Sequence, residues 1–331
     1  MEKKVRMADI AEALGISVVS VSKALSGREG VGDEMRRKII TTAEEMGYVP
    51  LRTKPRDKLT TQSGNIGIVV ADLFFADNTF YSSLYRQVLV SCRHRGYSAL
   101  MEPVTREAER DCVLPTMVSE GKVDGLIFMG EIDRHYLKTL AESGLPYMLL
   151  DFYDDDLDVA SVTSDNVTGG YRLTRHLIRS GRRDVGFVGR IHSTSSIMDR
   201  FLGYSKALLK EGIPLRMDWI LEDRDEAGQY IPLELPRRMP RAFVCSCDGI
   251  AYNMVVRLKQ EGYRVPEDVA VVGYDDHYYS QLCDPQLTTY RVNVEEMGKA
   301  VVDQLVAKIR GEHVNCRNTV INGRFVKRDS T

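Results

Sequence analysis

Apolar residues in the first 50 positions recur every three to four residues, which predicts three short helices. We expect these helices over about 8–14, 18–25 and 33–46, each followed by a glycine. Ser17 offers a side-chain oxygen to the free amides at the start of the second helix. Two helices joined by a short turn that contains a glycine form a helix-turn-helix. A small helical bundle without any DNA role has the same spacing, and at this point it stays open as an alternative.

The second predicted helix has one apolar face and one face without acidic residues. At about 100° per residue, its inward side holds Val21, Ala24 and Leu25. The outer surface of this helix, which could contact DNA, holds Val18, Val19, Ser22 and Lys23. A short surface without carboxylates can enter the major groove of DNA, so the pattern favours a DNA-reading helix.

From residue 66 the pattern changes to short apolar runs that alternate with amphipathic segments. The runs are IGIVVAD, DGLIFMG, YMLLD, VGFVG, AFVCSCD and VAVVGYDD. Buried strands that alternate with helices predict parallel sheets with helices on both faces. The number of strands favours a two-lobed α/β body behind an all-α headpiece. Residues 51–65 are polar and lack periodicity, so we expect them to be the linker.

Charge and cysteine usage narrow the class of protein. Residues 1–58 hold 12 Lys+Arg and 9 Asp+Glu, whereas the remainder holds 33 and 38. A mildly basic front on an acidic body suits a DNA contact limited to the front. The six cysteines have neither disulfide nor zinc spacing, and no leader or apolar run near 18 residues occurs. We therefore expect a reduced, cytoplasmic protein without membrane contact. No phosphate-binding glycine loop appears, so we expect neither a cofactor nor a metal.

The segment ADIAEALGISVVSVSKALSGREGV resembles the DNA-binding headpiece of the lactose/galactose repressor family. The family pattern matches Asp9, Ala11, Gly15, Ser17, Val21, Ser22, Leu25 and Gly27. The resemblance implies DNA contacts by Arg6, Ser17, Val18, Val19, Ser20, Ser22 and Lys23. Val18 and Val19 take the two base-reading positions, where valine can pack only on thymine methyl groups. Lys23 stands where the family usually has arginine, which implies a looser base preference.

The linker departs from the family. There the resemblance implies a hinge helix that inserts a leucine into the minor groove, but the motif P-N-x-x-A-R-x-L is not present. Leu59 lies two residues late and is the only candidate wedge. Pro55 fits only the first turn of a helix, and Asp57 is unfavourable beside phosphate. We therefore expect a weaker or differently built hinge.

Several of the predicted strands end in a carboxylate. Asp72, Asp151, Asp248 and Asp275 stand at these positions, and Arg200 follows in DRFLGY. Open parallel sheets bind ligands at the carboxyl edge of their strands. Carboxylates and a guanidinium in one cavity suit a polyhydroxylated ligand. Each aspartate alone has a simpler interpretation, because it can cap the next helix.

The body also resembles the same family, through VTSDNVTGGYRLTRHLIRSGRRDVGFVG, RFLGYSKAL and VPEDVAVVGYDD. That body is similar to periplasmic sugar-binding proteins, with two lobes joined by three crossings near 159–164, 287–293 and 320–324. The expected division is 1–50 headpiece, 51–65 hinge, 66–160 with 292–320 first lobe, and 161–291 with 321–331 second lobe. The expected effector-binding residues are Phe80, Tyr81, Asp151, Ser196, Arg200, Asp248 and Asp275. Core packing remains open for Phe80 and Tyr81, and Cys247 stands where the family has asparagine.

The resemblance implies a homodimeric transcription regulator, most often a repressor, that binds a pseudo-palindromic operator in double-stranded DNA. A small polar effector, of the carbohydrate class, would bind between the lobes and change operator affinity. Two other classes stay open on the residues alone. A sugar-binding protein without a DNA role would leave the headpiece idle, and an enzyme would have to act through paired carboxylates, since no nucleophile motif is present.

Overall fold

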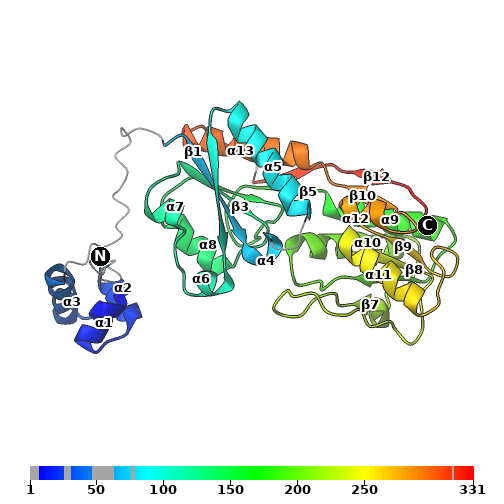
Figure 1. Ribbon diagram of the computed structural model, residues 1–331, viewed down its shortest axis with the longest axis horizontal. Coiled ribbons are helices and arrows are strands. Elements are labelled where there is room, and N and C mark those ends of the chain that lie inside the picture. Colours follow the sequence, from blue (N-terminus) through cyan, green and yellow to red (C-terminus); the bar gives the residue numbers. More distant parts are fainter. Residues whose placement is uncertain (1–6, 26–30, 47–62, 76–78, 315–316) are drawn as a thin grey trace. The chain divides into compact units, whose positions relative to one another are not determined.

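The computed structural model describes residues 7–25, 31–46, 63–75, 79–314 and 317–331 (Figure 1). The chain separates into two compact units, Met1–Thr60 and Thr61–Thr331. Arg6, Leu59 and most of the expected hinge lie outside the described residues. Among the described residues, no helix is both long enough and apolar enough to cross a bilayer.

The first unit contains the three expected helices, α1 (Met7–Leu14), α2 (Val18–Leu25) and α3 (Asp33–Glu45). Their inward faces form a small core of Ile10, Ala11, Val21, Ala24, Ile39 and Ala43. Gly15 has a φ of +64°, a backbone conformation that favours glycine and lets the chain turn after α1. The Ser17 Oγ accepts a hydrogen bond from the Ser20 amide at 3.1 Å, so Ser17 caps α2 as predicted.

The second unit begins with a six-stranded parallel sheet in the order β11-β5-β4-β3-β1-β2. Its strands are β1 (Asn65–Ala71), β2 (Ser98–Val104), β3 (Gly125–Met129), β4 (Tyr147–Leu150), β5 (Ser161–Ser164) and β11 (Asn318–Ile321). Its helices are α4 (Asp72–Phe75), α5 (Thr79–His94), α6 (Arg106–Arg110), α7 (Thr116–Ser119), α8 (Arg134–Ala141) and α13 (Val294–Ile309). This sheet and its helices are the first lobe (Figure 1).

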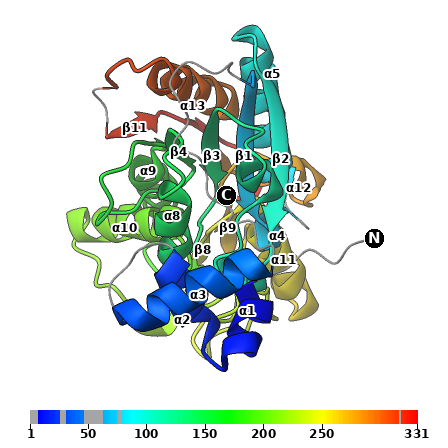
Figure 2. The same cartoon turned by 90° about the vertical axis from the view of Figure 1, so that its left-hand side faces the viewer.

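Alternation along β1 shows why helices cover both faces of this sheet. Ile66, Ile68 and Val70 share one core with α5 and α13, which pack side by side (Figure 2). Val69 and Ala71 point the other way, into a second core with α7 and α8. Successive side chains of a strand face opposite sides, so an unbroken apolar run needs cover on both, as expected.

The second lobe has a four-stranded parallel sheet in the order β7-β6-β8-β9. Its strands are β6 (Val185–Val188), β7 (Ile220–Leu221), β8 (Ala242–Cys245) and β9 (Ala270–Val272). Its helices are α9 (Asn166–Arg179), α10 (Ser195–Lys210), α11 (Asp248–Gln260) and α12 (Tyr278–Leu282), with the short 3-10 helix η1 (Met217–Trp219). Gly170 allows α9 and α10 to pack closely, because a Cβ there would lie 2.2 Å from the Arg200 carbonyl oxygen.

Three crossings join the lobes near the expected positions. The chain passes from β5 into α9, from β10 (Thr289–Arg291) into α13, and from β11 into β12 (Arg324–Val326). β10 and β12 pair in an antiparallel ribbon that contacts α9 of the second lobe. The first sheet extends through Ser164, beyond the division expected at residue 160, because β5 pairs with both β4 and β11.

Candidate functional site

The outer face of α2 is the candidate DNA-reading surface of the headpiece. Val18 is 46% exposed although it is apolar, Lys23 is exposed, and α2 contains no acidic residue. Ser17 is also exposed, but its hydroxyl lies 2.9 Å from that of Ser20, so these two hydroxyls already interact. Val19 and Ser22 belong to the same helix, and their side chains lie outside the description.

In the second unit, a cavity of about 70 Å³ lies between the two lobes. One water needs roughly 10–15 Å³ of such space, so the cavity holds several waters or one small polar molecule. Six of the seven expected effector-binding residues line it, namely Phe80, Tyr81, Asp151, Ser196, Arg200 and Asp275. They come from the carboxyl edges of both sheets, as the strand-end rule predicts for parallel sheets.

Arg200 is buried on α10, and contacts within its own lobe fix its position. Its Nε donates to Asn166 Oδ1 at 2.9 Å, and its Nη1 donates to the Ser246 carbonyl oxygen at 2.6 Å. The guanidinium carbon lies 3.9 Å from the centre of the Tyr274 ring, a favourable cation–π distance. The remaining nitrogen, Nη2, lies 3.7 Å from Asp275 Oδ1, so it points to the carboxylate of the cavity.

Two buried carboxylates face this cavity with unused acceptor oxygens. Asp151 Oδ2 accepts a hydrogen bond from the Tyr81 hydroxyl at 3.0 Å, whereas its Oδ1 has no hydrogen-bond partner among the described residues. Asp275 Oδ1 likewise has no hydrogen-bond partner there. Both residues have positive φ angles, 68° and 105°, which are strained for a residue with a side chain. Buried oxygens that lack a hydrogen-bond donor, on a strained backbone, are typical of a site that binds a ligand with hydroxyl donors.

Burial also changes the protonation of these two groups. Removal from water raises the pKa of Asp151 to about 6 and that of Asp275 to about 7, although the Arg200 charge opposes both shifts. At neutral pH the cavity therefore contains carboxyl groups that exchange protons readily. This suits a ligand that brings its own hydroxyl donors, because each donor favours the ionised form.

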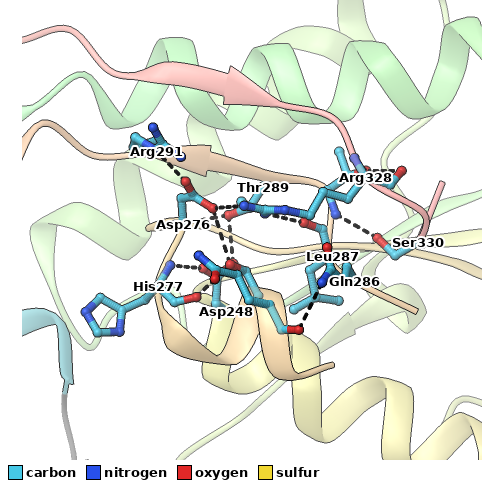
Figure 3. A network of polar contacts seen from close by, with 12 residues as sticks. Asp248, Asp276, His277, Gln286, Leu287, Thr289, Arg291, Arg328 and Ser330 are labelled. Atoms are coloured by element: carbon cyan, nitrogen blue, oxygen red, sulfur yellow. Dashed lines mark hydrogen bonds and ion pairs between the residues drawn. The ribbon is translucent and has the colours of Figure 1, made fainter. Parts of the chain in front are cut away.

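Asp248 is the exception among the expected ligand residues, because its carboxylate does not line the cavity. It accepts hydrogen bonds from the Thr289 hydroxyl and the His277 amide, both at 2.7 Å (Figure 3). Asp248 therefore anchors the start of α11 to β10 and to the segment after β9. Its place after a strand is as expected, but its side chain turns toward the neighbouring strands and away from the ligand space. Asp72, also a strand-end carboxylate, is exposed at the start of α4.

The residues after Asp275 connect the cavity to the crossings and to the first lobe. Asp276 accepts hydrogen bonds from Arg291 Nε and Arg328 Nη2, both at 2.5 Å, and so ties β10 to the C-terminal segment (Figure 3). The next residue, His277, lies 3.1 Å from the Ser83 hydroxyl on α5 of the first lobe. A change at Asp275 is thus two residues from a contact between the lobes.

Further polar contacts hold the lobes together around the cavity. Glu131 Oε2 accepts hydrogen bonds from the Ser195 amide and hydroxyl at 3.1 and 3.2 Å. The Tyr153 hydroxyl donates to Asp199 at 3.0 Å, and Arg106 donates to the Ala227 carbonyl oxygen. These pairs join opposite lobes, so the structure shows the two lobes closed on each other.

Sequence reasoning missed the loop that follows β7. Arg224, Gly228 and Tyr230 line the cavity from this loop, and Asp223 lies directly beneath Arg224. The signal that identified the other carboxylates was present here, since Asp223 follows a strand end. That strand, Ile220–Leu221, is only two residues long, so no apolar run in the sequence predicts it.

Comparisons with known proteins bear on both units. A profile described as "Bacterial regulatory proteins, lacI family" matches residues 6–50, and one described as "Periplasmic binding protein-like domain" matches residues 174–331. The chain combines a lacI-type DNA-binding domain with a periplasmic-binding-protein-like body. The ribose operon repressor of Haemophilus influenzae is 28% identical over 329 residues, which cover 98% of each chain.

Solved structures agree with this assignment at the level of the fold. The complex of the transcriptional regulator CelR with cellobiose has a TM-score of 0.71 and 24% identity, covering 99% of this chain and all of that one. The lac repressor dimer bound to operator and the anti-inducer ONPF has a TM-score of 0.68 and 22% identity, covering 99% of each chain. The lacI-type headpiece and the curated relatives, most of which are named as repressors, make this chain a DNA-binding transcription regulator with an effector-binding body.

Proposed function

We propose that this regulator is a cytoplasmic, homodimeric repressor whose affinity for a pseudo-palindromic operator depends on a small polyhydroxylated effector. One observation carries the proposal: residues from both lobes line one cavity, and two carboxylate oxygens there have no hydrogen-bond donor among the described residues. Carboxylates paired with a guanidinium match the vicinal hydroxyls of a carbohydrate. The names of the relatives, which include a ribose operon repressor and a cellobiose-bound regulator, favour the same ligand class.

On the DNA side, the proposal assigns base reading to Val18 and Val19, with Lys23 as the cationic reader. Arg6, Ser17, Ser20 and Ser22 would contact the backbone or neighbouring bases, and Leu59 would be the minor-groove wedge. The exposure of Val18 on an acid-free helix supports this role, since an apolar side chain is otherwise better buried. We therefore expect a thymine opposite one of the valines in each half-site.

Effector binding would act through closure of the two lobes. A ligand on Asp151 and Asp275 contacts both lobes at once and so favours the closed arrangement over an open one. The segment that starts at Asp275 also carries the contacts of Asp276 with the crossings and of His277 with α5. We propose that the headpiece, hinge and two lobes follow the division given above, with the first lobe extended through Ser164. Relative rotation of the lobes would then change how the two headpieces of a dimer are spaced.

Operator selection from random duplex DNA by the full-length protein tests this proposal. We expect enrichment of a pseudo-palindrome, with affinity that falls steeply as salt rises because basic groups displace counterions from phosphate. Replacing the thymine opposite the valines by uracil removes only the methyl group and should weaken binding. A sugar-binding protein without a DNA role would enrich no sequence, and that outcome would refute the proposal.

A further inference from the structure

The guanidinium of Arg224 has one edge without a protein partner. Arg224 lines the cavity and is only 8% exposed. Its Nε donates to Asp223 Oδ1 at 3.0 Å, and its Nη2 donates to Asp223 Oδ2 at 2.7 Å. Arginine has five N–H donors, so this pairing leaves three. Two of them, one on Nη1 and one on Nη2, lie along the edge formed by these two nitrogens, and Nη1 has no hydrogen-bond acceptor among the described residues.

The carboxylate beneath Arg224 neutralises it only in part. Asp223 is completely buried, and it also accepts hydrogen bonds from the Arg190 amide at 2.9 Å and the Ser246 hydroxyl at 3.1 Å. Its negative charge is therefore shared among four donor groups from three residues. The two-point contact with Asp223 also fixes the plane of the guanidinium, and the Tyr230 ring lies 5.1 Å from its central carbon. The unpaired edge is thus rigidly oriented before any ligand binds.

The charges around the cavity accommodate one additional negative charge. Arg200 and Arg224 bring two positive charges, and Asp223 brings one fixed negative charge. Asp151 and Asp275 have raised pKa values of about 6 and 7 because they are buried, so both carboxyl groups are mostly protonated below about pH 6, and there the arginines exceed Asp223 by one positive charge. A monoanionic carboxylate can therefore bind at Arg224. A phosphate dianion would place a second charge beside the same two aspartates, at a higher electrostatic cost.

We propose that the effector is a sugar acid, with its carboxylate on the Nη1–Nη2 edge of Arg224 and its hydroxyls on Asp151 and Asp275. This inference rests on the proposed function, because it takes the cavity as the effector site. The planar edge of a guanidinium matches both oxygens of a carboxylate, which makes such pairs short, strong and specific. The two aspartates supply the acceptors that hydroxyl groups need. The three side chains together therefore fit one ligand that has a carboxylate at one end and hydroxyl groups along the rest.

The experiment is calorimetric titration of the full-length protein with matched pairs of ligands. The acids are D-glucuronate, D-galacturonate and D-gluconate, and the comparison ligands are D-glucose, D-galactose and D-glucose 6-phosphate. We expect at least one acid to bind about tenfold or more tightly than its parent sugar. Arg224→Met should weaken that acid by about thirtyfold or more, because it removes one side of a buried charge pair.

Two further variants keep the test decisive. Arg190→Met removes an arginine of the same lobe that pairs with Glu222 at 3.0 Å and does not line the cavity, so acid binding should persist. Arg224→Lys keeps the charge without the planar edge, and should retain only part of the preference if Arg224→Met does not fold. The fluorescence of Trp219, the single tryptophan of the chain, reports whether each variant folds.

Three outcomes would overturn the inference: neutral or phosphorylated sugars that bind as tightly as the acids, no binding of any acid at millimolar concentration, or an acid preference that survives in both Arg224 variants. Operator binding measured on the same samples separates this from the proposed function. If operator DNA binds while the acids fail, only the sugar-acid inference falls. If no protein sample binds any selected DNA, the proposed function itself falls.

Discussion

The two lobes contribute very different side chains to the same cavity. The first lobe supplies mainly apolar and aromatic groups, Leu73, Phe74, Phe80 and Tyr81, with Asp151 as its one charged group. The second lobe supplies most of the polar lining, Thr194, Ser196, Arg200, Arg224, Tyr230, Ser246, Cys247 and Asp275. Hydrogen bonds within the second lobe already hold Arg200 and Arg224 in place. The contrast indicates that the second lobe recognises the ligand, whereas the first lobe covers it and excludes water.

Removal of Arg200 should have the largest effect, because it takes the central cation out of the recognising lobe. Arg200→Met leaves Asn166 Oδ1 and the Ser246 carbonyl without their donor and leaves Asp275 without its cation. We expect the free energy of unfolding to fall by about 3–5 kcal/mol, the usual effect of breaking a buried ion pair. Urea unfolding followed by the fluorescence of Trp219, which is buried in the same lobe, measures this.

The matched control for Arg200 is Arg264→Met. Arg264 pairs with Asp268 at 2.9 Å in the same lobe, but its side chain is 72% exposed. Such a surface pair contributes about 0–1 kcal/mol. Equal destabilisation by the two variants would contradict the central role of Arg200.

Stability should depend on pH, more through the carboxylate of the second lobe than through that of the first. The raised pKa values mean that folded Asp275 (about 7) and Asp151 (about 6) hold protons that the unfolded chain has already released. Between about pH 4 and pH 7 the folded state therefore binds more protons, and stability falls as the pH rises through that range. We expect a loss of about 4 kcal/mol between pH 5 and pH 8 in the ligand-free protein, with about two thirds of it from Asp275.

Two isosteric variants show how much of this loss of stability comes from the carboxylate of each lobe. Asp275→Asn should remove more of the pH dependence than Asp151→Asn, because the pKa of Asp275 is shifted further. Urea unfolding at pH 5 and pH 8 gives the comparison. If both variants keep the slope of the unchanged protein, the titrating groups lie elsewhere.

Substitution of Gly228 tests how closely the two lobes pack against each other, and not the stability of either lobe alone. It has a φ of +71°, and a Cβ there would lie 2.6 Å from Leu73 Cδ2 of the first lobe. Gly228→Ala should therefore shift the protein toward an open arrangement by about 1–2 kcal/mol. Amide hydrogen exchange in peptides that cover residues 224–230 should become about tenfold faster.

A second change separates the clash from backbone strain. Leu73→Ala in the Gly228→Ala protein makes room for the added methyl group but leaves the positive φ unchanged. Exchange should then return most of the way to that of the unchanged protein. Persistently fast exchange in the double variant would mean that strain in the loop, and not closure against Leu73, dominates.

The sequence predicts the sheets more reliably than the side-chain directions around the cavity. Unbroken apolar runs need cover on both faces, so the main parallel strands and their helices follow from pattern alone, as β1 shows. The sequence also predicts which residues lie at the carboxyl edge, because the carboxyl ends of parallel strands meet at the same edge of a sheet. Whether a strand-end side chain faces the cavity is decided by the local backbone. Asp275 turns inward with a φ of 105°, whereas Asp248 starts a helix and turns toward Thr289.

Arg224 is a second residue whose place in the cavity could not be predicted from the sequence. Its position depends on a two-residue strand and on a buried pairing with Asp223, and neither leaves a periodic signal in the sequence. The headpiece gives the opposite case, since the bounds of α2 and its buried residues Val21 and Ala24 follow from a 3.6-residue period and a serine cap. Elements with a clear apolar run or period are thus predictable from sequence, whereas β2, which is mostly only partly buried, is not among the predicted runs. The loops that complete a ligand site are predictable only where they follow a recognisable strand.

The smallest expected effect belongs to the polar contact between α5 and the segment after Asp275. Ser83→Ala removes the hydroxyl that lies 3.1 Å from His277 Nε2, while the rest of the interface remains. A single partly exposed hydrogen bond contributes about 0.5–1 kcal/mol, which corresponds to a decrease of about 1–3 °C in Tm for a unit of this size. Ser91→Ala is the matched control, because Ser91 lies on the same helix and its side chain has no hydrogen-bond partner among the described residues. Differential scanning calorimetry of the ligand-free protein should show a decrease for Ser83→Ala alone. If both serine variants melt with the unchanged protein, then burial of the apolar first-lobe residues, and not this polar contact, holds the first lobe against the second.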